Sequence, residues 1–314
     1  EESKMKHTLL IITALMLIVG CSSPEPINYE ETLNERDGVH YTKDTNKPYS
    51  GPVFSLDKNG QKIWEGTIKD GKKDGKWTNF YKGQKFQQIT YKDGESNGLC
   101  IVWHENGQKR EEGTLKDGKR EGLWTDWGEN GQLWLESIYI DGEWDGEYTY
   151  WYENGQKKEQ GTAKGSDRDV RPAPAGNTTY WYDNGQKKEE GTYKDGERDR
   201  KWTGWYENGQ KRYEETYKKY VGEWQEGTFD VAKDVKHSYW YDNGQKWIEI
   251  TYKDGVWTEW YENGQKWKEG IFKNGELDGK WTFFNEDGSI KDDMDEDEED
   301  DWGVGYEDYE WDDW

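Results

Sequence analysis

A glycine-centred turn recurs ten times along this chain of 314 residues and constrains its fold more than any other feature. The turn lies in a repeated stretch that reads approximately Trp-Tyr-Glu-Asn-Gly-Gln-Lys-Lys-Glu-Glu-Gly-Thr-Tyr-Lys-Asp-Gly. Successive turn glycines are 20 to 35 residues apart and mostly 24: Gly60, Gly83, Gly107, Gly131, Gly155, Gly185, Gly209, Gly244, Gly264 and Gly288. Such a period is typical of repeat proteins and indicates one elongated array.

Each repeat is predicted to be a β-hairpin. Asn-Gly between two alternating runs favours a two-residue type I′ turn, because both central positions need a positive φ that Asn and Gly tolerate best. With residues 208–209 as such a turn, Trp205 is expected opposite Arg212. In the same register Trp202 is expected opposite Glu215. The fold class is therefore all-β, an elongated single-layer array of tandem antiparallel β-hairpins.

Aromatic rings are expected on both faces of this sheet, because side chains alternate along a strand and rings occupy consecutive positions. The chain has 21 Trp and 22 Tyr, and each ring can bury ~150–250 Å² while its polar end stays wet. A ring is also expected to cover bare backbone at a cross-strand glycine such as Gly113. The Trp three positions before the turn Asn recurs in seven repeats, and these are the candidate binding rings: Trp103, Trp127, Trp151, Trp181, Trp205, Trp240 and Trp260.

The first 20 residues are predicted to be a secretory signal, with an expected signal helix. A short basic start precedes an apolar run from Leu9 to Val19, which is too short for a membrane span of ~20 residues. Gly20-Cys21 at its end resembles the lipobox of bacterial lipoproteins. That resemblance implies cleavage before Cys21, lipidation of Cys21, and a lipid-anchored protein of the bacterial cell envelope. The alternative is a plain secreted protein; in either case residues 21–49 are expected to be a tether.

The other end of the chain is strongly acidic. Residues 286–314 contain 16 acidic residues and one lysine, a large share of the formal net charge of −24. Like charges at this density oppose collapse, so residues 289–314 are expected to be a solvated, disordered tail. Trp and Tyr alternate with Asp and Glu from residue 302 onwards, which is consistent with either a docking motif or an exposed end.

A second turn links one hairpin to the next. In residues 66–77 it reads Gly-Thr-Ile-Lys-Asp-Gly-Lys-Lys-Asp-Gly-Lys-Trp, and residues 113–124 repeat the pattern. This pattern resembles the MORN repeat, and the full unit resembles the bacterial MORN-repeat variant found in YwqK-type antitoxin-family proteins. The resemblance covers about residues 50–288. It implies an array of antiparallel hairpins that serves binding or scaffolding and has no catalytic centre.

Two stretches depart from the repeat. Residues 164–176 are rich in proline and small residues and indicate a longer loop, and residues 218–227 resemble a partial extra strand. Insertions in repeat arrays often lie on the binding face. Decay of a repeat is the equally favoured alternative.

No catalytic, metal or cofactor site is predicted. His104 stands at a repeat Tyr position, while His237 and Cys100 stand at a repeat Trp position, so all three are expected to fill aromatic slots. The recurring Glu pairs indicate a strand pattern rather than a unique acid pair. The acidic balance disfavours nucleic acid, since affinity for it depends on neutralising phosphates.

These observations predict a non-catalytic envelope lipoprotein whose array binds another macromolecule, most readily a protein. Two alternatives stay open. An antitoxin or immunity role would sequester a basic toxin, which the acidic balance favours. A cell-wall or glycan-binding role would use the Trp and Tyr rings as stacking platforms.

Overall fold

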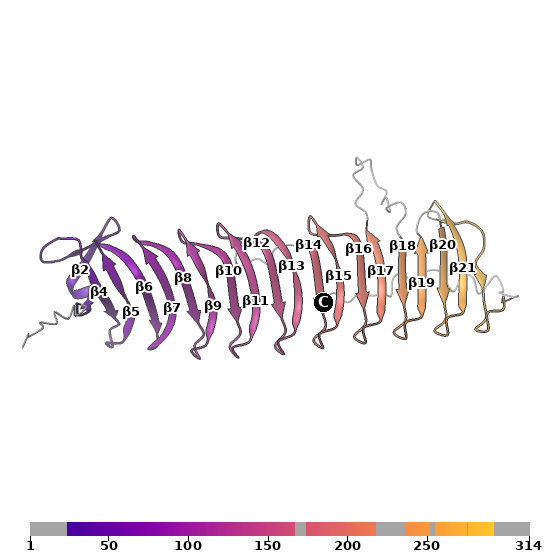
Figure 1. Ribbon diagram of the computed structural model, residues 1–314, viewed down its shortest axis with the longest axis horizontal. Coiled ribbons are helices and arrows are strands. Elements are labelled where there is room, and N and C mark those ends of the chain that lie inside the picture. The colour runs from indigo at the N-terminus through magenta and orange to yellow at the C-terminus, as the bar shows by residue number, and fades with distance from the viewer. Residues whose placement is uncertain (1–23, 167–173, 218–235, 252–254, 275, 292–314) are drawn as a thin grey trace, which may run out of the picture.

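The chain forms one long array of β-strands that runs from an N-terminal cap to the last hairpins (Figure 1). The computed structural model describes residues 24–166, 174–217, 236–251, 255–274 and 276–291. The strands lie side by side in a single layer, and the two ends of the described chain lie at opposite ends of the array. The signal segment, Cys21 and residues 292–314 of the acidic tail lie outside the described residues.

The array is built from short strands of similar length that follow one another along the chain. Their bounds are β4 (Gly51–Leu56), β5 (Lys62–Lys69), β6 (Lys72–Tyr81), β7 (Gln84–Lys92), β8 (Glu95–Trp103), β9 (Lys109–Lys116), β10 (Lys119–Trp127), β11 (Leu133–Ile140), β12 (Glu143–Trp151), β13 (Lys157–Ser166), β14 (Pro174–Trp181), β15 (Lys187–Lys194), β16 (Glu197–Trp205), β17 (Lys211–Tyr217), β18 (Lys236–Trp240), β19 (Lys246–Thr251), β20 (Gly255–Trp260), β21 (Lys266–Lys273), β22 (Glu276–Leu277) and β23 (Thr282–Phe283).

Each strand from β4 to β21 pairs antiparallel with the next one, and β22 and β23 both pair with β21. With β1 (Ile27–Asn28), which runs parallel to β4, these strands make a 21-stranded sheet. This confirms the prediction of an all-β array of tandem antiparallel hairpins.

The type I′ turns lie at the Asp-Gly links between hairpins, not at the Asn-Gly turns. Asp117 and Gly118 both have positive φ, 50° and 80°, and Lys116 pairs directly with Lys119. The same two-residue geometry recurs at residues 70–71, 93–94, 141–142 and 195–196. Asp suits this site for the reason proposed for Asn, since its short polar side chain tolerates a left-handed backbone.

The Asn-Gly turns have a different conformation, and the prediction for them was wrong. Of residues 207–209 only Gly209 has a positive φ, 84°. The Tyr206 N–H donates to the carbonyl of Gln210, and the Gly209 N–H donates to the carbonyl of Tyr206, which leaves a three-residue loop. This is a type I turn followed by a left-handed glycine, the usual alternative to a two-residue hairpin.

The extra loop residue produces a β-bulge beside the turn. Trp205 therefore pairs with Lys211 and not with Arg212 as predicted. Beyond the bulge the expected register returns, and Trp202 pairs with Glu215 as predicted. A bulge in this position adds twist to the sheet and lets each turn lean towards the next one.

Residues 27–49, assigned to a tether by the sequence, form a folded cap on the first hairpin instead. The cap consists of β1, a single helical turn α1 (Tyr29–Thr32), β2 (Leu33–Arg36) and β3 (Val39–Thr42). Leu33 is buried in one cluster with Val53, Ile68 and Trp77. The cap covers the apolar end of an array whose first strand would otherwise leave an open edge.

The core lies on one face of the sheet, here called the core face, and consists of rings that lie flat over the backbone of neighbouring strands. The Trp124 indole covers Gly113, Trp202 covers Gly191 and Trp77 covers Gly66, so that a Cβ at any of these glycines would overlap the ring. Each indole N–H also donates to a threonine carbonyl of the covered strand, at 3.1 to 3.2 Å. Covering of glycine by a ring is therefore confirmed, although the ring comes from the next strand across the Asp-Gly link and not from the strand opposite the glycine within its own hairpin.

Both departures from the repeat lie largely outside the described residues. Of the loop at residues 164–176, positions 167–173 are outside, and so are residues 218–227 entirely. Within the part of the chain that the structure describes, no helix is long and apolar enough to cross a membrane.

Candidate interaction surfaces

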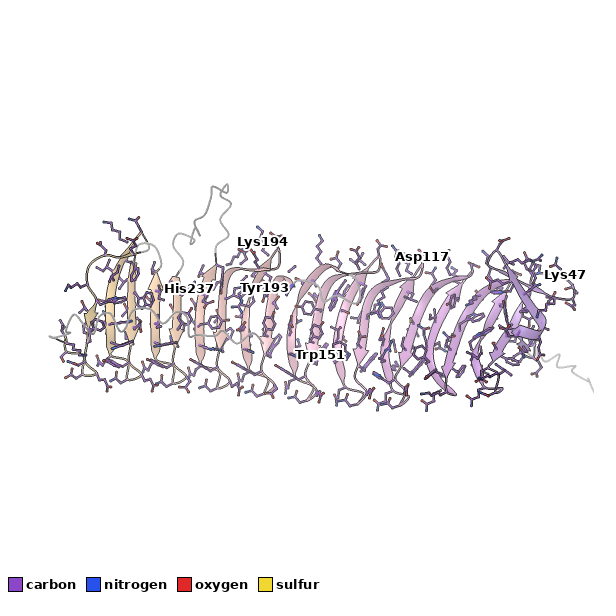
Figure 2. The ribbon with its side chains drawn as sticks, turned by 180° about the vertical axis from the view of Figure 1, so that it is seen from behind. Lys47, Asp117, Trp151, Tyr193, Lys194 and His237 are labelled. Carbon is purple, nitrogen blue, oxygen red and sulfur yellow. The ribbon has the colours of Figure 1, made fainter. Side chains whose placement is uncertain are left out.

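The seven candidate binding rings lie near the Asn-Gly turns, on the face opposite the core. Thr203 and Trp205 share this face, and Lys187 and Glu190 lie on the adjacent strand beside them. We call it the lysine face. Figure 2 shows Trp151 towards the edge that carries the Asn-Gly turns, with Asp117 and Lys194 at the opposite edge. All seven rings are half-buried.

The rings of the lysine face are stacked against lysines. The Lys187 ammonium lies 5.7 Å from the Trp205 ring centre and 2.5 Å from a carboxylate oxygen of Glu190. The same lysine-to-Trp contact joins Lys109 with Trp127, Lys157 with Trp181, Lys211 with Trp240 and Lys246 with Trp260. Each contact joins consecutive repeats, so a lysine of the neighbouring repeat already covers part of five of the seven rings.

Acidic residues of the lysine face bind two lysines each in the later repeats. Glu214 lies 2.8 Å from Lys211 and 2.9 Å from Lys201. Burial by itself would raise the pKa of Glu214, but hydrogen bonds and charge from these lysines hold that pKa below its ordinary value. Glu249 is in the same position between Lys246 and Lys236.

Tyrosines beside the Asn-Gly turns link one repeat to the next through a hydrogen bond from the hydroxyl to a backbone carbonyl, here called a staple. The Tyr182 hydroxyl donates to the backbone carbonyl of Trp205 at 2.8 Å. Four further tyrosines do the same one repeat apart, at 2.8 to 2.9 Å: Tyr152 to Trp181, Tyr206 to Trp240, Tyr241 to Trp260 and Tyr261 to Phe284. Four of the candidate binding tryptophans therefore accept, through their backbone carbonyls, the hydrogen bonds that join neighbouring repeats.

In its own repeat His104 makes the contact that tyrosine makes in the others. Its Nε2 lies 2.8 Å from the backbone carbonyl of Trp127 and is placed to donate to it. Cys100 is buried in the core cluster with Trp124 and Tyr139. Both placements confirm that these residues fill repeat slots that elsewhere hold aromatic rings.

The turn asparagines form a second ladder along the same edge. The Asn208 side-chain carbonyl accepts from the Gln210 N–H, and its amide donates to the carbonyl of Asp242 in the next turn. Five further asparagines make the same turn-to-turn bond: Asn106, Asn154, Asn184, Asn243 and Asn263. Asn therefore recurs for its two-sided hydrogen bonding rather than for a left-handed backbone, a role that the sequence analysis missed.

The core face carries buried carboxylates among its rings. Glu111 is bound by Arg110 and Arg120, and Glu159 accepts from the Tyr148 hydroxyl at 2.5 Å. Farther along, Glu215 accepts from Tyr217 and Tyr239 at 2.5 and 2.7 Å. Such pairing is what allows acids to stay inside a thin aromatic layer.

Burial and these acids shift the neighbouring ionisable groups. Burial, followed by the hydrogen bond to Glu215, raises the pKa of Tyr217 to about 12. Burial lowers the pKa of His237, against smaller opposing effects of Glu215 and Thr216. His237 lies between the rings of Tyr217 and Tyr239 and keeps the position that Trp202 has in the preceding repeat. Its neutral form is therefore the stable one at neutral pH.

The Gly83 hairpin contains a feature that the sequence analysis did not single out. Its turn lacks the asparagine, and Lys82 and Gly83 form a tight two-residue turn with φ of 50° and 80°. A hollow of about 130 Å³ opens between this shorter tip and the next turn. Its lining residues, here called the Tyr81 notch, are Tyr81, Lys82, Gln84, Lys85, Phe86, Trp103, His104 and Glu105. The sequence indicates this deletion through the 23-residue spacing from Gly60 to Gly83, one residue shorter than the usual 24.

Among the described residues no cluster of His, Cys, Asp and Glu has an arrangement suited to a metal ion. The lysine face as a whole is a long surface on which the same Trp and Lys groups recur from repeat to repeat.

The MORN repeat variant family matches the chain in seven segments: residues 96–117, 120–141, 144–164, 175–195, 201–219, 233–254 and 253–274. No curated protein matches the chain. The matched segments begin at β8, and the hairpins from β4 to β7 continue the same sheet ahead of them. Residues 96–274 of this chain therefore carry seven MORN repeat variants.

Proposed function

We propose that the repeat array is a non-catalytic scaffold on the bacterial cell envelope, to which the chain is anchored through lipidated Cys21. Another macromolecule, most readily a protein, docks along the lysine face. The observation that carries this proposal is the recurrence of one surface unit in successive repeats: a Trp ring contacted by a lysine, and that lysine bonded to a glutamate or, at Lys157, to Gln160. Repeats two strands apart offer the same groups about every 10 Å, which suits an extended partner.

The surface can be tested with a photo-crosslinking residue placed on the lysine face. Leu123 shares that face with Trp127 and is among the most exposed apolar side chains of the described residues. We expect a discrete cross-linked product in live cells at position 123. The control position is Asp117, exposed in the Asp-Gly turn at the opposite edge of the sheet (Figure 2). Equal product at both positions, or none at either, would contradict docking on the lysine face.

The anchor requires its own test. Cys21→Ser removes the proposed lipid attachment and should move the protein from the detergent phase to the aqueous phase of a membrane extract. Cys100→Ser is the matched control, because it removes the chain's other cysteine. Unchanged partitioning of the Cys21 variant would overturn the lipoprotein proposal without affecting the scaffold proposal.

An antitoxin role is a second candidate, favoured by the formal net charge of −24. An acidic array would attract a basic toxin over a distance and lose that attraction in high salt. Glycan binding is less favoured, because lysines already lie over most of the lysine-face rings. Retention on purified cell-wall polysaccharide, weakened by Trp181→Ala, would support it instead.

A further inference from the structure

The Gly83 hairpin reverses the charge of the array. Residues 58–92 contain nine lysines and three acidic residues, a net charge of +6 within a chain of −24. Gln87 and Gln88 stand where the Gly107 hairpin has Glu111 and Glu112. This hairpin therefore lacks the two acids that elsewhere neutralise the return strand.

The same hairpin leaves two rings open to solvent. Tyr81 is 54% exposed and Phe86 is 45% exposed, and both line the Tyr81 notch. Tyr81 occupies the position of the stapling tyrosines, but no hydrogen bond from its hydroxyl is found in the described part of the chain. The half-buried Trp103 and His104 form the opposite wall. At about 130 Å³ the notch approaches the roughly 150 Å³ that hold a benzene ring in a protein core.

The charges around the notch favour an acidic ligand. Lys82 and Lys85 line it, and Lys82 also lies over the Tyr81 ring at 4.8 Å. The one acidic group of the lining is Glu105, which lies 3.9 Å from Lys82. Lys85 has no acidic partner among the described residues. A ligand that brings both an aromatic ring and carboxylates matches this combination of groups.

One segment of the chain has that chemistry, namely residues 302–314. It contains five aromatic residues, five acidic residues and no lysine or arginine. A further nine acidic residues precede it from position 292.

Within one chain the segment can reach the notch of its own array only when it is almost fully extended. Fourteen strand steps separate β7 from β21, which is about 67 Å at about 4.8 Å per step. From Lys291 to Trp311 the chain can span at most about 66 to 72 Å, and only when fully extended. Such extension is entropically costly, whereas a neighbouring copy can bring its segment directly to the notch.

We propose that residues 302–314 of one copy dock in the Tyr81 notch of a second copy. An aromatic side chain of the segment enters the hollow beside Phe86 and Trp103, and its carboxylates pair with Lys82 and Lys85. The contact joins unlike surfaces of the two copies, so we expect successive copies to associate into head-to-tail chains.

Sedimentation of the full chain over a range of concentrations tests this proposal. We expect chains that lengthen with concentration and shorten in high salt. Phe86→Ala and Lys85→Glu should each weaken the association at least tenfold, while Lys116→Glu, the same charge change at an exposed site far from the notch, should leave it unchanged. A synthetic peptide of residues 302–314 should disperse the chains, and a peptide with its aromatic residues replaced by alanine should not.

Charge reversal on both sides of the contact distinguishes loss of binding from misfolding of a variant, because only a correctly folded variant can recover association. Lys85→Glu combined with Asp312→Lys and Asp313→Lys should recover association that each single set loses. A wild-type chain that stays monomeric at all concentrations would overturn the proposal. So would association that both notch variants leave intact, or cross-linking of residues 302–314 to the notch within a monomer.

Discussion

The hydroxyl of Tyr206 donates a hydrogen bond of 2.8 Å to the backbone carbonyl of Trp240, 34 residues farther along the chain. The bond crosses from one hairpin to the next, and its acceptor belongs to one of the seven candidate binding rings. It shows how this array is held together, because in six repeats a turn side chain, one of five tyrosines or His104, satisfies a backbone carbonyl of the next repeat.

Removing that hydroxyl should weaken the array locally. Tyr206→Phe keeps the ring and leaves the Trp240 carbonyl without this donor, so we expect the free energy of unfolding to fall by about 1 kcal/mol. Tyr81→Phe is the matched control and should cost nothing, since the Tyr81 hydroxyl makes no such bond. Chemical denaturation followed by Trp fluorescence measures both. Equal losses would mean that the hydroxyl bond does not stabilise the array.

A staple can also be added where one is missing. Gly128 stands at the stapling position of its hairpin, has no positive φ, and is followed one repeat later by Trp151. Gly128→Tyr should donate to the Trp151 carbonyl and raise the free energy of unfolding by about 0.5 to 1.5 kcal/mol. Gly128→Phe separates the ring from the hydroxyl. If the two variants are equally stable, the gain comes from loss of glycine and not from the staple.

The glycines under the core rings should not tolerate a side chain. A Cβ at Gly191 would overlap the Trp202 indole, so Gly191→Ala should lower the free energy of unfolding by about 1 to 3 kcal/mol. Gly128→Ala is the control, because its new Cβ would meet no ring and would approach only Asn130 Oδ1, at 3.0 Å, and the Gln132 carbonyl, at 3.9 Å. Thermal unfolding compares the two, and an equally tolerated Gly191→Ala would show that the ring can move aside.

Two histidines should make stability depend on pH. Burial lowers the pKa of His237 and of His40, so the unfolded chain takes up protons first as the pH falls below 6.5. Stability is then full above this value and decreases as the pH falls from about 7 towards the lower folded pKa values. His237→Phe should remove part of this dependence, and the double variant with His40→Phe should remove more.

Denaturation midpoints between pH 7 and pH 5 provide the measurement for this prediction. An unchanged slope in the His237 variant would indicate that its imidazole takes up a proton without penalty in the folded chain. Glu214, whose folded pKa is lowered, contributes to the pH dependence below about 4.5 and therefore outside this window.

Local sequence chemistry determined the repeat architecture of this protein. The period of the turn glycines gives an array, and counting outward from the turn places Trp202 opposite Glu215, because the bulge compensates for the extra loop residue. The repeat pattern predicts where the side chains of His104 and Cys100 lie, because equivalent positions in different repeats have the same surroundings. These properties are predictable because they repeat within one hairpin or between adjacent hairpins.

Only the tertiary structure decided how the repeats are joined and closed. Asn-Gly adopts a three-residue loop instead of a type I′ turn, since its asparagine also bonds to the next turn. Residues 27–49 look like a polar linker, yet Leu33 and its neighbours become a cap by burying apolar area against Val53 and Trp77. The Tyr81 notch exists because a one-residue deletion shortens one hairpin beside a neighbour of normal length. Each of these depends on contacts between segments that the sequence order alone does not bring together.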